Sequence, residues 1–131
     1  MKNIAILIVR YAIAITFLSA VADRFGYWGS PGEANVAWGN FSNFLDYTGI
    51  LNPWASKELL PIIGGIATFL EIIFAFMLMI GIEVKKAALG SAVLLMIFAL
   101  SMALTLGIKV PLDYSVFSAC AAAFLLYAVT E

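Results

Sequence analysis

The sequence predicts an all-α integral membrane protein, a bundle of four transmembrane helices with a short interfacial amphipathic helix between the first two. Two observations predict this fold class. Of the 131 residues, 64% are hydrophobic and only 11% are charged, with a mean hydropathy of +1.05, whereas soluble domains are ~45–50% apolar and ~25% charged. The hydrophobic residues also gather into four separate segments. Because so little polar surface cannot cover a soluble domain, we expect residues 1–131 to form a single transmembrane domain.

The four apolar segments cover residues 4–22, 59–82, 87–108 and 114–129. A membrane-spanning helix needs ~20 residues, with ~17 as a lower limit. The first three segments meet this length, and the shorter fourth one predicts an upright helix or a locally thinned bilayer. Lipid offers no partner to backbone polar groups, so we expect helices rather than open strands.

An alternative for the first segment is a secretory signal peptide, because Lys2 precedes an apolar stretch that ends in Ala20-Val21-Ala22, a small-residue cleavage pattern. Arg10 interrupts what would be the uncharged core of such a peptide. We therefore expect this segment to be retained as a transmembrane helix.

The basic residues of the loops predict the topology. One side of the membrane would carry the amino terminus, Lys2, Arg10, Lys85 and Lys86, and the other Arg24, Lys57 and Lys109. The positive-inside rule counts Lys and Arg, and it favours the first side as cytoplasmic. We expect a multi-pass protein of the bacterial cytoplasmic (inner) membrane with both termini in the cytoplasm.

Residues 23–58 form the only long loop, which this topology places outside the cytoplasm. Apolar residues recur every three or four positions between Val36 and Thr48, which predicts an amphipathic helix in the interface over about residues 36–47. Trp28 and Trp38 belong to an aromatic belt in this loop. Such aromatics usually anchor depth, and the alternative is a lid over a site that opens toward the outer leaflet.

Two charged residues lie inside apolar segments, Arg10 in the first and Glu71 in the second. Each costs ~2.5–3.5 kcal/mol to insert. At ~1.5 Å per residue, Arg10 lies ~10 Å and Glu71 ~16 Å from the cytoplasmic end, a difference that an arginine can bridge. We therefore predict a buried Arg10–Glu71 ion pair or ligand site. The alternatives are that Arg10 snorkels to the head groups while Glu71 is protonated, or that the pair only fixes helix register.

The turn before the fourth segment contains several polar residues. Gly107 should end the third helix, and Asp113 should cap the fourth by accepting from the amides of Ser115 or Val116. Lys109 should pair with Asp113. A sharper alternative is that Lys109, Asp113 and Tyr114, together with Trp28 and Trp38, form the rim of an outward-opening pocket.

The composition excludes several classes of function. The chain has no histidine and one cysteine, Cys120, which removes the usual zinc sites, a CxxC redox pair and an iron–sulfur cluster. The net charge of −1, with no basic run longer than Lys85-Lys86, gives no sign of nucleic-acid binding. We assign no metal site and no catalytic residue, and whether the chain takes part in an enzyme stays open.

The sequence resembles the DoxX family of small four-helix bacterial membrane proteins. The resemblance covers most of the chain and rests on short motifs: Arg10 early in the first segment, Asp23-Arg24-Phe25-Gly26 closing it, Ala67-Thr68-Phe69-Leu70-Glu71 in the second, and residues 106–115 (LGIKVPLDYS) before the last. The first loop is longer than in the simplest members of the family.

The resemblance implies a link to thiosulfate:quinone oxidoreductase subunits and to membrane complexes that handle thiol and oxidative stress. We accordingly expect a small subunit or accessory protein of such an oxidoreductase assembly, with membrane lipids and a larger membrane complex as partners. It would have no covalently bound cofactor and an intramembrane pocket for a quinone or lipid near Arg10 and Glu71. The alternatives are an assembly factor or chaperone for another membrane protein and, with four spans and no internal repeat, a small transporter.

Overall fold

The computed structural model describes residues 1–131 as six helices without a strand. The helices are α1 (Lys2–Arg24), α2 (Phe41–Leu51), α3 (Leu60–Ile80), α4 (Val84–Leu106), α5 (Lys109–Asp113) and α6 (Val116–Val129). The all-helical class predicted from the sequence is confirmed, and each predicted apolar segment coincides with one helix to within three residues at either end. The helix that the sequence predicts over about residues 36–47 is found five residues later, as α2, because Asn40 caps its first turn by accepting from the Asn43 amide at 2.7 Å.

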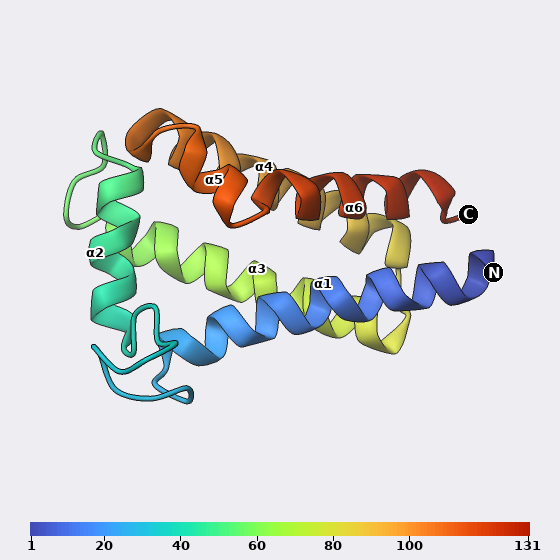
Figure 1. The fold of residues 1–131 in the computed structure, drawn as a ribbon, viewed down its shortest axis with the longest axis horizontal. Helices are drawn as coiled ribbons and strands as arrows, with labels where there is room; N and C mark the ends of the chain where they lie inside the picture. The colour runs from blue at the N-terminus through green and yellow to red at the C-terminus, as the bar shows by residue number, and fades with distance from the viewer.

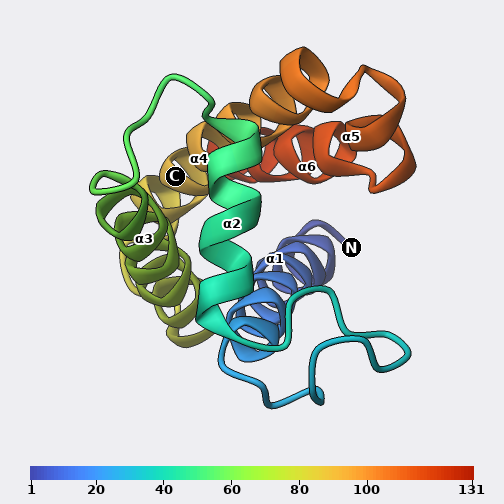
Figure 2. The ribbon, with the colours of Figure 1, turned by 90° about the vertical axis from the view of Figure 1, so that its left-hand side faces the viewer.

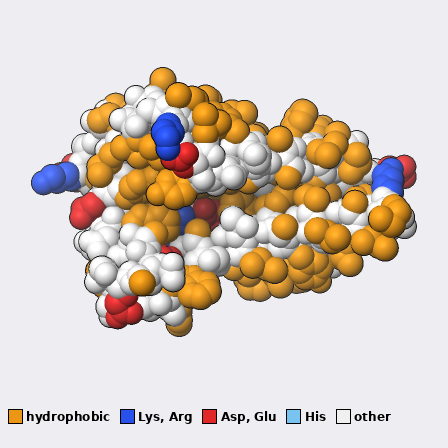
Figure 3. All heavy atoms as spheres, viewed as in Figure 1, with side chains coloured by type: hydrophobic (Ala, Val, Ile, Leu, Met, Phe, Trp, Pro, Cys, Tyr) orange, Lys and Arg blue, Asp and Glu red, His pale blue; other side chains and the backbone are white.

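Three of these helices, α1, α3 and α4, are long and apolar enough to cross a membrane. Figure 3 shows why they suit lipid: hydrophobic side chains cover much of the molecule's length, whereas most of the visible charged ones lie toward its two ends. At 14 residues, α6 is apolar but shorter. The structure is therefore that of a membrane helical bundle.

The four apolar helices α1, α3, α4 and α6 pack as two pairs. α1 lies against α3 and α4 against α6, and the pairs meet where α3 contacts α4 and α1 contacts α6. α2 lies across one end of the bundle, as Figures 1 and 2 show, and packs mainly on α3. Both termini lie at the opposite end, where the Lys85 Nζ donates to the carbonyls of Tyr127 (3.3 Å) and Thr130 (2.8 Å).

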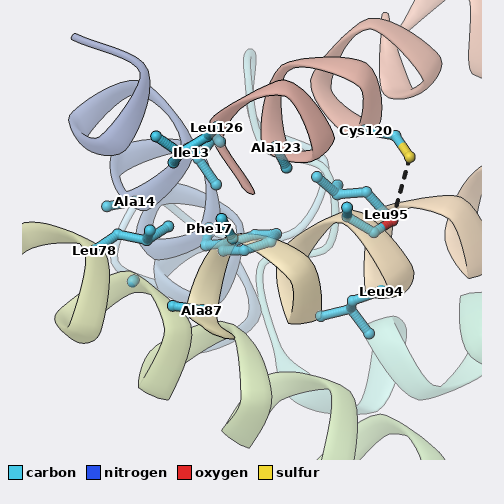
Figure 4. Packing of buried hydrophobic residues seen from close by; sticks show 13 residues of the cluster. Ile13, Ala14, Phe17, Leu78, Ala87, Leu94, Leu95, Cys120, Ala123 and Leu126 are labelled. Atoms are coloured by element: carbon cyan, nitrogen blue, oxygen red, sulfur yellow. Dashed lines mark hydrogen bonds between the residues drawn. The ribbon is translucent and has the colours of Figure 1, made fainter. Parts of the chain in front are cut away.

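A single hydrophobic cluster joins the two pairs (Figure 4). Ile13 and Phe17 of α1 lie among buried residues of α3, α4 and α6. Many of the buried residues of α4 and α6 are small, including Ala88 and Ala123, and the thiol of Cys120 donates to the Ala92 carbonyl at 3.2 Å. Small side chains let helix backbones approach closely, which is the usual basis of helix association in lipid.

The connection between α4 and α6 differs from the prediction. Gly107 ends α4 as expected, with a φ of +100° that glycine adopts readily. The Asp113 cap was wrong: residues 109–113 form the short helix α5, and the residue before α6 is Ser115, which makes no side-chain capping bond. Because Lys109 and Asp113 lie one turn apart in α5, they form the predicted ion pair, at 2.6 Å on the exposed surface.

Candidate functional site

Glu71 lies on the buried face of α3. Apart from the adjacent Ala67 and Thr68, the buried residues of this helix recur every three or four positions: Gly64, Ala67, Thr68, Glu71, Ala75 and Leu78. This is the spacing of one helix face. Glu71 is only 2% exposed, so its carboxylate has to find its partner inside the protein.

The partner of Glu71 is Arg24, so the predicted Arg10–Glu71 pair was wrong. Arg24 Nη1 donates to Glu71 Oε2, and Arg24 Nη2 donates to Glu71 Oε1 at 3.2 Å. Arg24 Nη1 also donates to the Thr68 hydroxyl, one turn earlier on α3, at 2.9 Å. This two-pronged arrangement is the one that a guanidinium and a carboxylate favour.

Arg10 instead binds the carboxyl end of α3. Its Nε donates to the Leu78 carbonyl at 2.8 Å and its Nη2 to the Met79 carbonyl at 3.3 Å. These carbonyls belong to the last turn of the helix, where a positive charge is favourable. Because Glu71 lies seven residues before Leu78, ~10 Å along the axis, Arg10 does not reach it. Side chains on a helix tilt toward its amino terminus, so the Arg10 side chain extends toward the end of the bundle that holds the termini, away from Glu71.

The sequence predicts Arg24 among the loop residues, whereas the structure places it as the last residue of α1, buried inside the bundle. Ala14, Phe17, Val21 and Arg24 are buried and spaced by three, four and three residues. The stripe that packs the helix therefore continues to its last residue. Side chains on a helix tilt toward its amino terminus, so Arg24 extends back into the bundle toward Glu71. Continuing the apolar spacing past Ala22 would have identified it.

Two aromatic rings cover the guanidinium. The Arg24 Cζ lies 3.8 Å from the ring centre of Phe44, on α2, and 5.2 Å from that of Trp38. The two rings pack edge to face, with centres 5.0 Å apart. Arg24 is 2% exposed, and its Nε has no hydrogen-bond partner. The site thus contains a buried donor left free beneath an aromatic cover.

Asp23 holds that cover in place. Its carboxylate accepts hydrogen bonds from three successive backbone amides, those of Ala37 (2.8 Å), Trp38 (2.7 Å) and Gly39 (3.0 Å). Gly39 has a φ of +79°, and a Cβ there would collide with the backbone of Pro31. Two adjacent residues of α1 therefore have different roles: Asp23 fixes the loop, and Arg24 binds Glu71.

Of the predicted rim residues, only Trp38 lies at the ion pair. Trp28 is mostly exposed, and its indole donates to the Ser19 carbonyl at 3.0 Å, along α1. Lys109 and Asp113 form their exposed pair on α5. Tyr114 is exposed. The pKa of Tyr47, on α2, is raised mainly by the burial of Tyr47 and secondly by the nearby Tyr114 phenol. The rim residues therefore occupy the same end of the molecule without enclosing one pocket.

Two hollows elsewhere in the molecule include neither Arg24 nor Glu71. One is an apolar groove of about 450 Å³ between α3 and α4. The other, about 350 Å³, lies at the end with the termini and contains Lys2, Arg10 and Glu131. Figure 3 shows a further hollow between α5 and α1, with basic and acidic atoms at its bottom.

No three His, Cys, Asp or Glu side chains gather as a metal site would require.

Comparisons of the chain with protein-family models, with curated proteins and with solved structures find no match.

Proposed function

We propose that this chain is a member of the DoxX family and a small membrane subunit or accessory protein of a quinone-linked or thiol/oxidative-stress oxidoreductase assembly. Two motifs that carry the resemblance, Asp23-Arg24-Phe25-Gly26 and Ala67-Thr68-Phe69-Leu70-Glu71, are far apart in the sequence, yet the Arg24–Glu71 pair joins them. Their meeting at one buried site supports a common purpose for both motifs.

The proposal includes four spans, with α6 as the short fourth one and both termini in the cytoplasm. α2 then lies in the outer interface of the bacterial inner membrane. Its Phe44 is buried against the bundle end and its Asp46 is exposed. Spin labels along residues 41–51 should report membrane depth with a period of about 3.6 residues. Uniform water accessibility along α2 would contradict the interfacial placement.

Within such an assembly, the Arg24–Glu71 site would bind the polar head of a quinone or lipid. The observation that carries this proposal is the free Nε of Arg24, a buried donor that a quinone carbonyl or a lipid oxygen could accept from. Phe44 and Trp38 offer flat apolar faces beside it. A bound quinone would supply the redox chemistry, and Arg24 would orient its carbonyl. The electrons would come from a partner subunit.

The test for the ligand is the quinone retained by the purified protein, measured by extraction. The Arg24→Lys variant keeps the charge but loses Nε. Its quinone retention should fall by at least ~10-fold, because a hydrogen bond to a charged group contributes ~1.5–3 kcal/mol. The matched control is Arg10→Lys, which alters an arginine outside the site and should retain the wild-type amount. Equal retention in both variants would contradict the ligand site.

The test for the assembly is co-purification from the native membrane in mild detergent. A redox enzyme recovered in fixed stoichiometry is the expected result. Transient recovery of newly made membrane proteins would instead support the assembly-factor alternative.

A further inference from the structure

An apolar groove of about 450 Å³ lies between α3 and α4, and it includes neither Arg24 nor Glu71. Leu70 and Phe74 of α3 form one wall, and Leu89, Val93 and Ile97 of α4 form the other. Lys86 is the one charged residue that lines it. Val93 and Ile97 are each more than half exposed, so the groove is open to the side of the bundle.

The length of the groove matches one leaflet. Lys86 and Ile97 are separated by eleven residues of α4, which is ~17 Å at ~1.5 Å per residue. The hydrocarbon core is ~30 Å thick, so the groove extends from the membrane surface to about the midplane. Lys86 lies in the first turn of α4, directly after the turn from α3, and therefore stands at the surface end.

The charge at that end is available to a ligand. The neighbouring Lys85 is engaged by the carbonyls of Tyr127 and Thr130. Lys86 has only Glu83, at 3.3 Å, and both side chains are more than half exposed. Exposed pairs of this kind are weak, so a phosphate can displace Glu83 from the Lys86 ammonium.

We propose that this groove binds an anionic phospholipid, with one acyl chain along Leu70, Phe74, Val93 and Ile97 and the phosphate at Lys86. An acyl chain is the apolar ligand that spans one leaflet, and an ammonium at the head-group level selects a negative head group. The site serves a purpose separate from the quinone or lipid head site at Arg24, and it does not depend on that proposal.

The experiment is native mass spectrometry of the full chain in detergent, titrated with phosphatidylglycerol or with phosphatidylcholine of the same acyl chains. The wild type should prefer phosphatidylglycerol. Lys86→Gln should weaken phosphatidylglycerol binding about fivefold, the effect of one basic residue near the surface, and leave phosphatidylcholine binding unchanged. Lys57→Gln removes one exposed lysine at the other end of the bundle and should change neither affinity.

A second variant tests the groove itself. Val93→Phe places a larger apolar side chain at an exposed position of the groove, so it should reduce binding of both lipids while the melting temperature stays at the wild-type value. Lipid binding that is equal for the two head groups, or unaffected by Lys86→Gln and Val93→Phe, would overturn the proposal.

Discussion

The guanidinium of Arg24 touches four side chains: the Glu71 carboxylate, the Thr68 hydroxyl and the rings of Phe44 and Trp38. Arginine and glutamate each cost ~2.5–3.5 kcal/mol or more to place in hydrocarbon. Two-pronged pairing and the ring contacts offset part of that cost. The interaction is therefore a condition for burying either charge, and its two members depend on each other.

Removing one member of this pair should destabilise the protein more than removing both. Arg24→Met or Glu71→Leu alone leaves a buried unpaired charge and should cost ~3–5 kcal/mol, whereas the double variant should lose clearly less. Unfolding by denaturant in micelles measures the free energy of unfolding of each of the three variants relative to the wild type. Lys109→Gln breaks the exposed Lys109–Asp113 pair and serves as the control, with little expected change. Additive losses in the double variant would contradict mutual dependence.

Removing the Asp23 carboxylate should loosen the loop that it holds. Asp23→Ala leaves the amides of residues 37–39 without their acceptor, at a cost of ~1–3 kcal/mol for each amide that stays buried. We expect residues 26–40 to become sensitive to protease while α1 and α3 remain helical. Asp46→Ala, at an exposed acidic residue of α2, is the control. Equal resistance of both variants to protease would show that the loop does not depend on this carboxylate.

At the scale of elements, α2 depends on a close approach to α3. A Cβ at Gly64 would lie 2.6 Å from Leu45 Cδ2 and 3.2 Å from Phe44 Cε2, both on α2. The adjacent Gly65 has nothing within 4 Å of that position. The two glycines therefore form a matched pair for testing how α2 is seated.

Gly64→Ala should push the Leu45 and Phe44 side chains of α2 aside and cost ~1–3 kcal/mol, the usual effect of overfilling a packed contact. Gly65→Ala should leave the stability unchanged or slightly higher, because alanine is the better helix former. Thermal unfolding followed by circular dichroism measures both, and tryptophan fluorescence reports the seating of Trp38. Equal stability of the two variants would contradict a tight α2–α3 contact.

The long elements could be predicted from the sequence because hydropathy and length act over some twenty residues at a time. The sequence does not predict α5, because its five residues include Pro111, and a proline favours a break between helices. The charged pair was misassigned for a different reason. Hydropathy places a residue along a helix, but its partner depends on the level and rotation of two helices. Only the buried spacing of Ala14, Phe17, Val21 and Arg24 carried that information.

At the scale of the whole molecule, the termini and the turn between α3 and α4 lie at one end, and α2 and α5 lie at the other. In the orientation proposed above, the two ends face opposite compartments. With Cys120→Ala as the background, Glu83→Cys and Ser56→Cys should react with an impermeant maleimide from opposite sides. Ser56→Cys should react from outside the cytoplasm in intact cells. Reaction of both from the same side would contradict the bundle orientation.

The position of the ion pair also bears on the order in which the chain is made. Arg24 ends α1 and Glu71 lies midway along α3, so both charged residues are synthesised before α4 and α6. Leaving the charge of α1 or α3 unpaired in lipid costs free energy. Proteins also fold from the amino terminus onward during synthesis. A helical hairpin of α1 and α3, closed by Arg24 and Glu71, is therefore the natural first product of membrane insertion, onto which the α4–α6 pair assembles.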